Sequence, residues 1–233
     1  MIWQGIVDAV GLLVRGDLAT WRIAALSLAV SGLATLLAAL AGVPLGAVLA
    51  LQRFRGRRLL LNVVHTGMGL PPVVVGLGVS LLLWRTGPLG YLQLIYTPAA
   101  MVSAQFIVAA PLAAGLTAAA VSLVDTELVA ALRVDGASEK RVLWETLQAV
   151  RPQVRVAIAA AFGRAVSEVG ASLMVGGNIL NETRILTTAI TLEVGKGEFA
   201  RAIALGIVLL ALAFVVNLGL VQGTRRALQP ALP

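Results

Sequence analysis

The sequence predicts an all-α integral membrane protein with five transmembrane helices and a helix-turn-helix segment in water between the third and the fourth. Its 233 residues are 59% hydrophobic and only 12% charged, whereas about a quarter of a soluble domain is charged. Apolar runs of the roughly 20 residues that a membrane crossing needs recur along the chain. Lysine and arginine gather in short segments between these runs, which is the pattern that fixes membrane orientation.

Residues 1–20 are expected to form an interfacial helix or a leader ahead of the membrane domain. Apolar residues recur there at helical spacing: Ile2, Ile6, Ala9, Val10 and Leu13. The segment has no basic beginning, and Asp8 interrupts its apolar run, so a secretory signal is not predicted.

The membrane domain is assigned to residues 21–224 and is followed by a cytoplasmic tail at 225–233. The expected spans are residues 23–51, 59–84, 98–123, 156–178 and 202–221. The connections 86–97 and 179–200 are expected to lie outside the cell, and the charges of the second are expected to be solvated.

The second span contains a proline pair that must interrupt its helix. Pro71 and Pro72 lie in the run GLPPVVVGLG, and adjacent prolines break or kink a helix. Because broken backbone is costly in lipid, this segment should be buried in protein or line a pathway. In the first span, Gly42 and Gly46 allow close packing of helices. His65, before the break, is better explained by a helix–helix hydrogen bond than by a pathway role.

Two opposite charges lie inside the fourth span. Arg164 and Glu168 are one helical turn apart, so they are predicted to pair. Charged residues at membrane depth are costly and commonly functional, so the pair is interpreted as either a gate or a structural link between helices. Small and polar neighbours could line the same pathway or serve packing alone: Ser167, Gly170, Ser172, Gly177 and Asn178.

The charged segment 125–151, here called the elbow, interrupts the apolar pattern between the third and fourth spans. Apolar residues recur at helical spacing up to Asp135-Gly136, where glycine is expected to end the first helix. Ser138 is expected to cap a second short helix, and Pro152 suits the start of the next one. A rigid helical pair in water predicts a docking surface for another protein.

The 52–58 loop, the elbow and the tail hold most of the chain's 18 lysine and arginine residues. This bias predicts that all three are cytoplasmic and that the N-terminus is outside. It also removes the reason to expect a nucleic-acid partner. With no cysteine and one histidine, metal centres built from thiolates or imidazoles are not expected.

The elbow sequence VAALRVDGASEKRVLWETL resembles the cytoplasmic loop of ABC importer permeases. Gly136-Ala137-Ser138 matches the centre of that family's pattern. Ala130-Ala131-Leu132 stands where the family has Glu-Ala-Ala, and Gln148-Ala149 stands where it has Leu-Pro. Docking of this chain is therefore expected to depend on packing more than on the family's glutamate.

Two further stretches are similar to the molybdate, tungstate and sulfate permeases of the same family. GLPPVVVGLG resembles their Pro-Pro segment, and FGRAVSEVGASLMVGGNI resembles their next span. The run that begins TRILTTAITLEVGKGEF is most similar to the tungstate-type branch. The resemblance extends over residues 60–221.

The resemblance implies the permease subunit of an ATP-driven oxyanion importer, most readily one for tungstate, in a bacterial or archaeal plasma membrane. Two copies would form the pore, a separate cytoplasmic ATPase would bind ATP and magnesium, and an extracytoplasmic binding protein would deliver the anion. The chain itself is expected to be no enzyme and to hold no cofactor, because it has no G-x-x-x-x-G-K-[ST] phosphate loop.

The resemblance assigns docking on the ATPase to the elbow, around the turn at Gly136 and Ser138. Apolar contacts are expected from Leu132, Val134, Ala137, Val142, Leu143 and Trp144. Charged residues are expected at the rim: Arg133, Asp135, Glu139 and Arg141. Two other interpretations stay open, namely a membrane scaffold that binds a different cytoplasmic protein through the elbow, and an ion-coupled carrier that uses Arg164 and Glu168.

Overall fold

A computed structural model describes residues 7, 10, 11 and 18–225, and within this part of the chain the regular elements are all helices. The predicted N-terminal segment and tail lie almost wholly outside the described residues. Three helices are long and apolar enough to cross a membrane: α2 (Leu18–Leu51), α5 (Pro98–Ser122) and α11 (Phe199–Arg225). The prediction of a span from Pro98 to 123 is confirmed by α5 almost to the residue. Thr97 begins this helix by accepting a hydrogen bond from the Ala100 N–H at 3.4 Å.

The second and fourth predicted spans are each two helices instead of one. A bend of 106° separates α3 (Arg57–Met68) from α4 (Pro72–Leu83), which confirms the predicted break at the proline pair. A bend of 56° separates α8 (Arg151–Val166) from α9 (Gly170–Gly176). The described helices therefore supply between three and five membrane crossings, depending on whether each bent pair counts as one.

The prediction that residues 179–200 form a solvated connection is wrong for the central part of this segment. Residues Leu186–Gly195 form an apolar helix, α10, which packs against α11 and α2. Leu186 and Ala189 are buried there, and so is the charged side chain of Glu193. The charged residues on either side suggested a polar loop, but the apolar residues between them have the spacing of one buried helix face.

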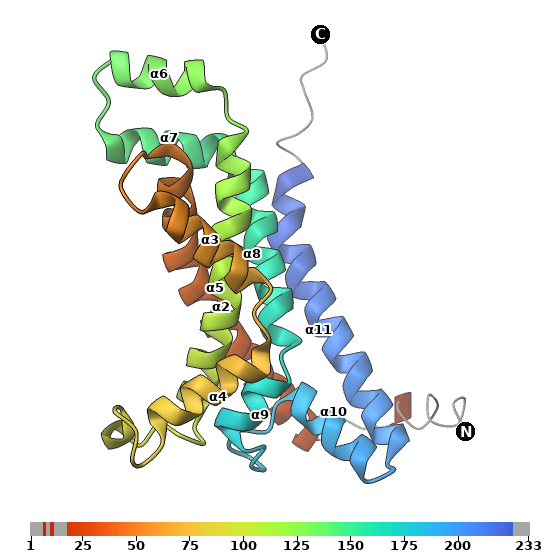
Figure 1. Ribbon diagram of the computed structural model, residues 1–233. Coiled ribbons are helices and arrows are strands. Elements are labelled where there is room, and N and C mark those ends of the chain that lie inside the picture. Colours follow the sequence, from red (N-terminus) through yellow and green to blue (C-terminus); the bar gives the residue numbers. More distant parts are fainter. Residues whose placement is uncertain (1–6, 8–9, 12–17, 226–233) are drawn as a thin grey trace.

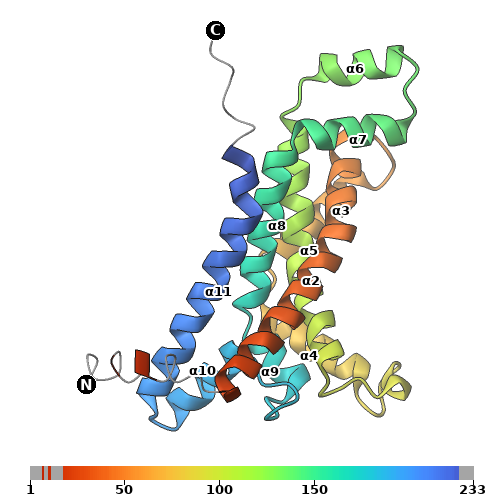
Figure 2. The same ribbon diagram turned by 180° about the vertical axis from the view of Figure 1, so that it is seen from behind.

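The long helices run side by side, and the shorter elements gather at their two ends (Figure 1). One end carries the 52–56 loop, the elbow helices α6 (Thr126–Val134) and α7 (Glu139–Ala149), and the end of α11. The other end carries α4, α9, α10 and the beginning of α2, as the view from behind also shows (Figure 2). The basic 52–58 loop and the elbow therefore lie at the same end of the molecule.

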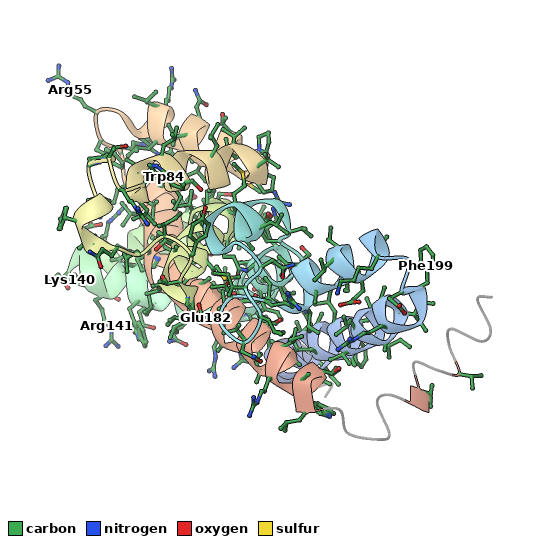
Figure 3. All side chains as sticks on the ribbon, turned by 90° about the horizontal axis from the view of Figure 1, so that it is seen from below. Arg55, Trp84, Lys140, Arg141, Glu182 and Phe199 are labelled. Atoms are coloured by element: carbon green, nitrogen blue, oxygen red, sulfur yellow. The ribbon has the colours of Figure 1, made fainter. Side chains whose placement is uncertain are left out.

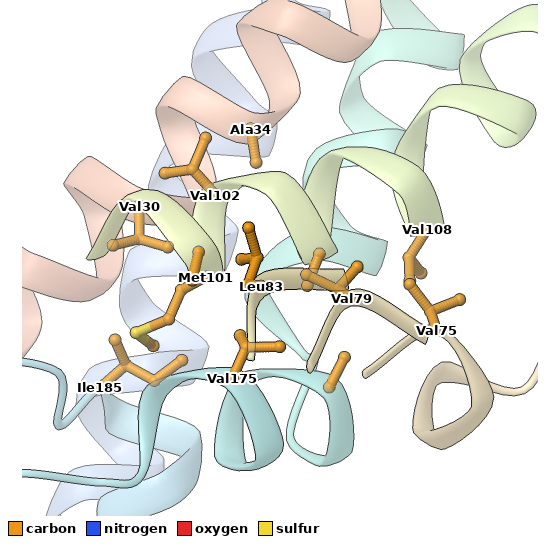
Figure 4. Packing of buried hydrophobic residues seen from close by; sticks show 13 residues of the cluster. Val30, Ala34, Val75, Val79, Leu83, Met101, Val102, Val108, Val175 and Ile185 are labelled. Carbon is orange, nitrogen blue, oxygen red and sulfur yellow. The ribbon is translucent and has the colours of Figure 1, made fainter. Parts of the chain in front are cut away.

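The core is densest where the two broken helices meet the long ones (Figure 4). Side chains from α2, α4, α5 and α9 form one cluster there, which includes Val30, Val79, Met101 and Val175. Farther along, α2 and α5 approach each other closely at Gly42. A Cβ added to this glycine would lie 2.9 Å from a backbone oxygen of α5. The predicted close packing at the glycines of the first span is confirmed.

Candidate functional site

The elbow is a compact helix pair whose turn depends on glycine. Gly136 has a φ of +80°, which L side chains rarely adopt. The N–H of Ala137 donates to the Leu132 carbonyl at 3.0 Å, and the N–H of Gly136 donates to the Arg133 carbonyl at 3.1 Å. These two bonds form a Schellman motif, which satisfies the last carbonyls of α6. The prediction that glycine ends the first elbow helix is confirmed.

The second elbow helix begins at a side-chain cap. The Ser138 hydroxyl accepts a hydrogen bond from the Arg141 N–H at 3.4 Å, as predicted. At the start of α6, Asp125 plays the corresponding part by accepting from the Glu127 N–H at 2.8 Å. Both helices of the elbow therefore have defined beginnings, which favours a rigid shape.

An ion pair closes the elbow across its turn. The Arg133 guanidinium donates to both carboxylate oxygens of Glu139, at 3.0 and 3.1 Å. These hydrogen bonds lower the pKa of Glu139 and raise the pKa of Arg133. Because both side chains are exposed, the pair adds definition to the turn more than stability.

The predicted docking residues separate into an outer and an inner group. Val134 is 86% exposed and Trp144 is 56% exposed, so they project from the elbow. Val142 is fully buried. Leu143 is half-buried and packs on residues from the ends of α2 and α5. Val142 is therefore removed from the docking set, because a fully buried side chain does not reach a partner.

The remaining predicted docking residues are accessible to differing degrees. Leu132 and Ala137 are half-buried. The charged positions are all exposed: Arg133, Asp135, Glu139 and Arg141. Sequence reasoning missed Leu123, which follows α5 just before the elbow and is 85% exposed. Its position beside a charged segment indicates only the end of a span, so its exposure could not be predicted from the sequence.

A second candidate site lies where the two broken helices meet, and the predicted ion pair there is wrong. Arg164 and Glu168 do not form one of the ion pairs found among the described residues. The reason is that α8 ends at Val166, so the two residues are not on one continuous helix. The buried Glu168 carboxylate instead accepts a hydrogen bond from the Ala171 N–H at 2.8 Å, at the start of α9.

Arg164 links the two breaks. Its Nη2 donates to the carbonyl of Leu70 at 3.4 Å, directly before Pro71 and Pro72. Prolines cannot supply N–H donors, so a break at a proline pair leaves carbonyls that need other partners. Gly170 lies beside Val73 of α4, since a Cβ added at Gly170 would approach that side chain to 2.8 Å.

Of the other predicted pathway residues, Ser172 lies inside the subunit. Its hydroxyl accepts a hydrogen bond from Nε2 of Gln105 at 3.0 Å, and both residues are fully buried. Ser167 is exposed and donates to the Arg164 carbonyl at 3.2 Å. Gln105 was missed from the sequence, although a lone amide in an apolar span is a signal for a partner in a neighbouring helix.

Gly177 and Asn178 lie together after α9, where both have positive φ values of 69° and 53°. They line a cavity of about 470 Å³ with residues of α9, α10 and the turn after α10: Leu173, Thr188, Thr191, Leu192, Gly195 and Lys196. Lys196 is held by an ion pair of 3.2 Å with the buried Glu193, which sequence analysis placed in solvent.

The model of the family described as "binding-protein-dependent transport system inner membrane component" matches residues 42–226. The tungstate uptake permease TupB of Peptoclostridium acidaminophilum is 39% identical over 93% of this chain and 95% of its own length. A probable anion ABC transporter permease of Haloferax volcanii is 42% identical over 84% of this chain and 86% of its own. The molybdenum transport permease ModB of Escherichia coli is 32% identical over 84% and 89%.

Solved structures with lower identity share the fold. A chain of a bacterial ABC transporter that imports alginate superposes with a TM-score of 0.75 at 21% identity, over 95% of this chain and 84% of that one. A chain of the inward-facing methionine transporter MetNI gives a TM-score of 0.68 at 21% identity, over 94% and 97%. These matches identify the arrangement of helices as that of importer permeases.

Proposed function

We propose that this chain, which belongs to the family of binding-protein-dependent transport system inner membrane components, moves tungstate through a homodimeric pore. Membership makes it a permease subunit of an ABC importer in the inner membrane. The anion would come from a separate extracytoplasmic binding protein. ATP and magnesium would be bound by a separate cytoplasmic ATPase, with no cofactor in this chain.

Tungstate is favoured by the relatives of this chain. TupB of Peptoclostridium acidaminophilum is 39% identical over nearly the whole chain, whereas ModB of Escherichia coli is 32% identical over a smaller share. Tungstate and molybdate are tetrahedral dianions of the same charge, so selection between them would fall to the binding protein as much as to the pore.

The observation that carries the proposal is the elbow. Its exposed apolar residues Val134 and Trp144 project from a helix pair that is fixed by two caps, a Schellman turn and an ion pair. Exposed apolar side chains on a rigid surface are typical of a protein interface. The elbow joins α5 directly to α8, so a partner that displaces it would move both helices.

The proposed orientation places the elbow in the cytoplasm and the N-terminus outside. The basic 52–58 loop and the elbow, which also contains lysine and arginine, lie at one end of the bundle, and α11 ends there too (Figure 1). Retention of lysine and arginine on the cytoplasmic side favours this arrangement.

Alternating access follows from a coupled motion of the broken helices. ATP-driven closure of the ATPase pair would displace the elbow as a rigid body, and α8 would transmit this displacement to the contact between Arg164 and Leu70. The two breaks could then change their packing together, as a two-state element that nucleotide and substrate both bias. Pro71, Pro72 and Gly170 would permit the change.

The test is uptake by proteoliposomes that contain the permease with its ATPase and are supplied with the loaded binding protein. ATP-dependent uptake of tungstate is expected, with molybdate as the main competitor. Gly136→Pro should abolish uptake without loss of membrane insertion, because proline cannot adopt the φ of +80° at the turn. Unchanged uptake by this variant would contradict the coupling role of the elbow.

The two alternatives have distinct outcomes in the same assay. A membrane scaffold would bind a cytoplasmic partner and show no ATP-dependent uptake. An ion-coupled carrier would lose uptake when the proton gradient collapses, whereas an ABC importer would retain it. The second alternative would use Arg164 and Glu168, which form no ion pair with each other among the described residues.

A further inference from the structure

A large cavity lies beside the elbow, on the side of the 52–57 loop. It has a volume of about 790 Å³ and is lined by the ends of α2 and α5, the beginnings of α3 and α7, and α6. Both ribbon views show the loop after α2 close to α7 at this end of the molecule (Figures 1 and 2). Its charged lining consists of Arg53, Arg57, Arg133 and Glu139. The rest of the lining is polar at Gln52, Ser122 and Thr126 and apolar at Ala50, Leu51, Val121, Val124, Val129 and Ala130.

The cavity has an excess of positive charge. Arg133 is already paired with Glu139 at 3.0 Å, so these two charges largely cancel. Arg53 and Arg57 remain, and neither forms an ion pair with any of the described residues. The 52–58 loop that supplies them contains no acid. An anion in the cavity would therefore meet two arginines that lack a counter-charge.

Arg57 is held in position for such an anion. Its Nε donates to the carbonyl of Leu49 at 2.6 Å, near the end of α2. This bond balances one of the free carbonyls that every helix leaves at its end. The bond uses Nε, and the two terminal nitrogens of the guanidinium stay available to bind an anion in the fork geometry that suits phosphate.

The apolar walls and the position of the cavity restrict the kind of anion. The cavity lies at the ends of two helices that are long and apolar enough to cross the membrane, where the hydrocarbon region gives way to headgroups. Leu51, Val124 and Ala130 of this lining are at least partly exposed, and a small inorganic anion would leave them in contact with water. An amphiphile would cover these walls with its glycerol and upper acyl carbons while its phosphate meets the arginines.

We propose that this cavity binds an anionic phospholipid, with the headgroup phosphate held by Arg53 and Arg57 and the acyl chains against the ends of α2 and α5. The inference goes beyond transport and does not depend on the identity of the transported anion. A lipid bound there would join the 52–57 loop to α6 and so fix the position of the elbow relative to α2. Phosphatidylglycerol is the probe, because it carries one negative charge and a neutral counterpart, phosphatidylcholine, is available.

The experiment measures retention of phosphatidylglycerol by the purified permease with native mass spectrometry. Phosphatidylglycerol is titrated into permease that is held in micelles containing phosphatidylcholine. One tightly retained phosphatidylglycerol per chain is expected. The double variant Arg53→Gln/Arg57→Gln should weaken retention about 30-fold, since each arginine near a membrane surface contributes roughly a fivefold factor. Arg53→Gln alone should weaken it about fivefold while leaving the Leu49 bond of Arg57 intact.

The matched control is Arg55→Gln/Arg58→Gln, which removes the same charge from the same loop. Neither residue lines the cavity, and Arg55 projects away from the body of the molecule (Figure 3). This control should retain the lipid within about twofold of the wild type. Equal losses in the two double variants would overturn the proposal, because retention would then reflect loop charge alone.

Two further measurements distinguish a lipid phosphate from a soluble phosphate and from a protein interface at the cavity. Glycerol 3-phosphate should fail to displace phosphatidylglycerol at tenfold molar excess, and displacement would assign the cavity to a soluble phosphate and overturn the lipid site. Attachment of the ATPase should leave the lipid in place. Its one-for-one release would instead make the cavity part of the protein interface, which would also refute the proposal.

Discussion

Two valines of the elbow allow the docking surface to be separated from its attachment to the bundle. Val134 is 86% exposed at the end of α6, whereas Val142, in α7, is fully buried. Both are valines on short helices of the same segment, so Val134→Ala and Val142→Ala make the same chemical change in opposite environments. We expect Val134→Ala to weaken binding to the ATPase and Val142→Ala to destabilise the permease itself.

The magnitudes follow from the exposed fractions. Valine to alanine removes two methyl groups, worth about 1.6 kcal/mol when fully buried. At Val142 the whole of this cost falls on folding, and the residual cavity raises it to about 2 kcal/mol. At Val134 little is lost on folding, but burial of its exposed surface under a partner would contribute about 1.4 kcal/mol, or roughly tenfold in Kd.

The assay measures both quantities on the same preparations. Thermal unfolding of the detergent-solubilised permease should show a fall in Tm of about 4–8 °C for Val142→Ala and of less than about 2 °C for Val134→Ala. Titration with the ATPase should show the reverse order, with a weaker Kd for Val134→Ala alone. Equal Tm losses in both variants would refute the division of the elbow into an outer and an inner surface.

Three more expectations concern other parts of the chain. Gly46→Leu should prevent recovery of monodisperse protein, because a side chain there meets the backbone of α5, whereas Gly32→Leu in the same helix meets open space and should be tolerated. The lowered pKa of Glu139 means that its ion pair with Arg133 is present above the ordinary glutamate pKa and is lost as pH falls through the folded value. A spin-label distance across the turn should therefore lengthen in acid, and Glu139→Gln should remove this pH dependence. Glu168→Gln keeps a carbonyl acceptor for the start of α9 and should melt close to the wild type, whereas Glu168→Leu leaves a buried N–H unpaired and should cost about 1–3 kcal/mol.

Local signals explain which parts of the fold could be predicted. Pro98, Gly136 and Ser138 act on their own backbone, through ring geometry, positive φ and a capping hydroxyl. The start of α5, the end of α6 and the start of α7 could therefore be predicted almost to the residue. The proline pair likewise predicted a break. The size of that break, 106°, could not be predicted, because it is set by the packing of α4 against α9 and α5.

Long-range contacts explain which predictions about the candidate sites were wrong. The spacing of Arg164 and Glu168 predicts a pair only if the helix is continuous, and the chain instead ends one helix between them. The elbow sequence shows that Val134 and Val142 are apolar, but their exposure depends on how the helix pair lies on the bundle. Periodicity identifies an apolar face and does not say whether the bundle or a partner covers it.

The geometry of α8 decides how a signal could travel between the two candidate sites. The helix begins at Arg151, directly after the elbow, and its 16 residues span about 24 Å at 1.5 Å per residue. Arg164, in its last turn, reaches the Leu70 carbonyl at the break between α3 and α4. An uninterrupted helix moves as a unit, so displacement of the elbow cannot be absorbed before it reaches this contact. Arg164→Gln should therefore leave ATPase binding unchanged and reduce uptake driven by ATP, and unchanged uptake would show that the contact does not transmit the motion.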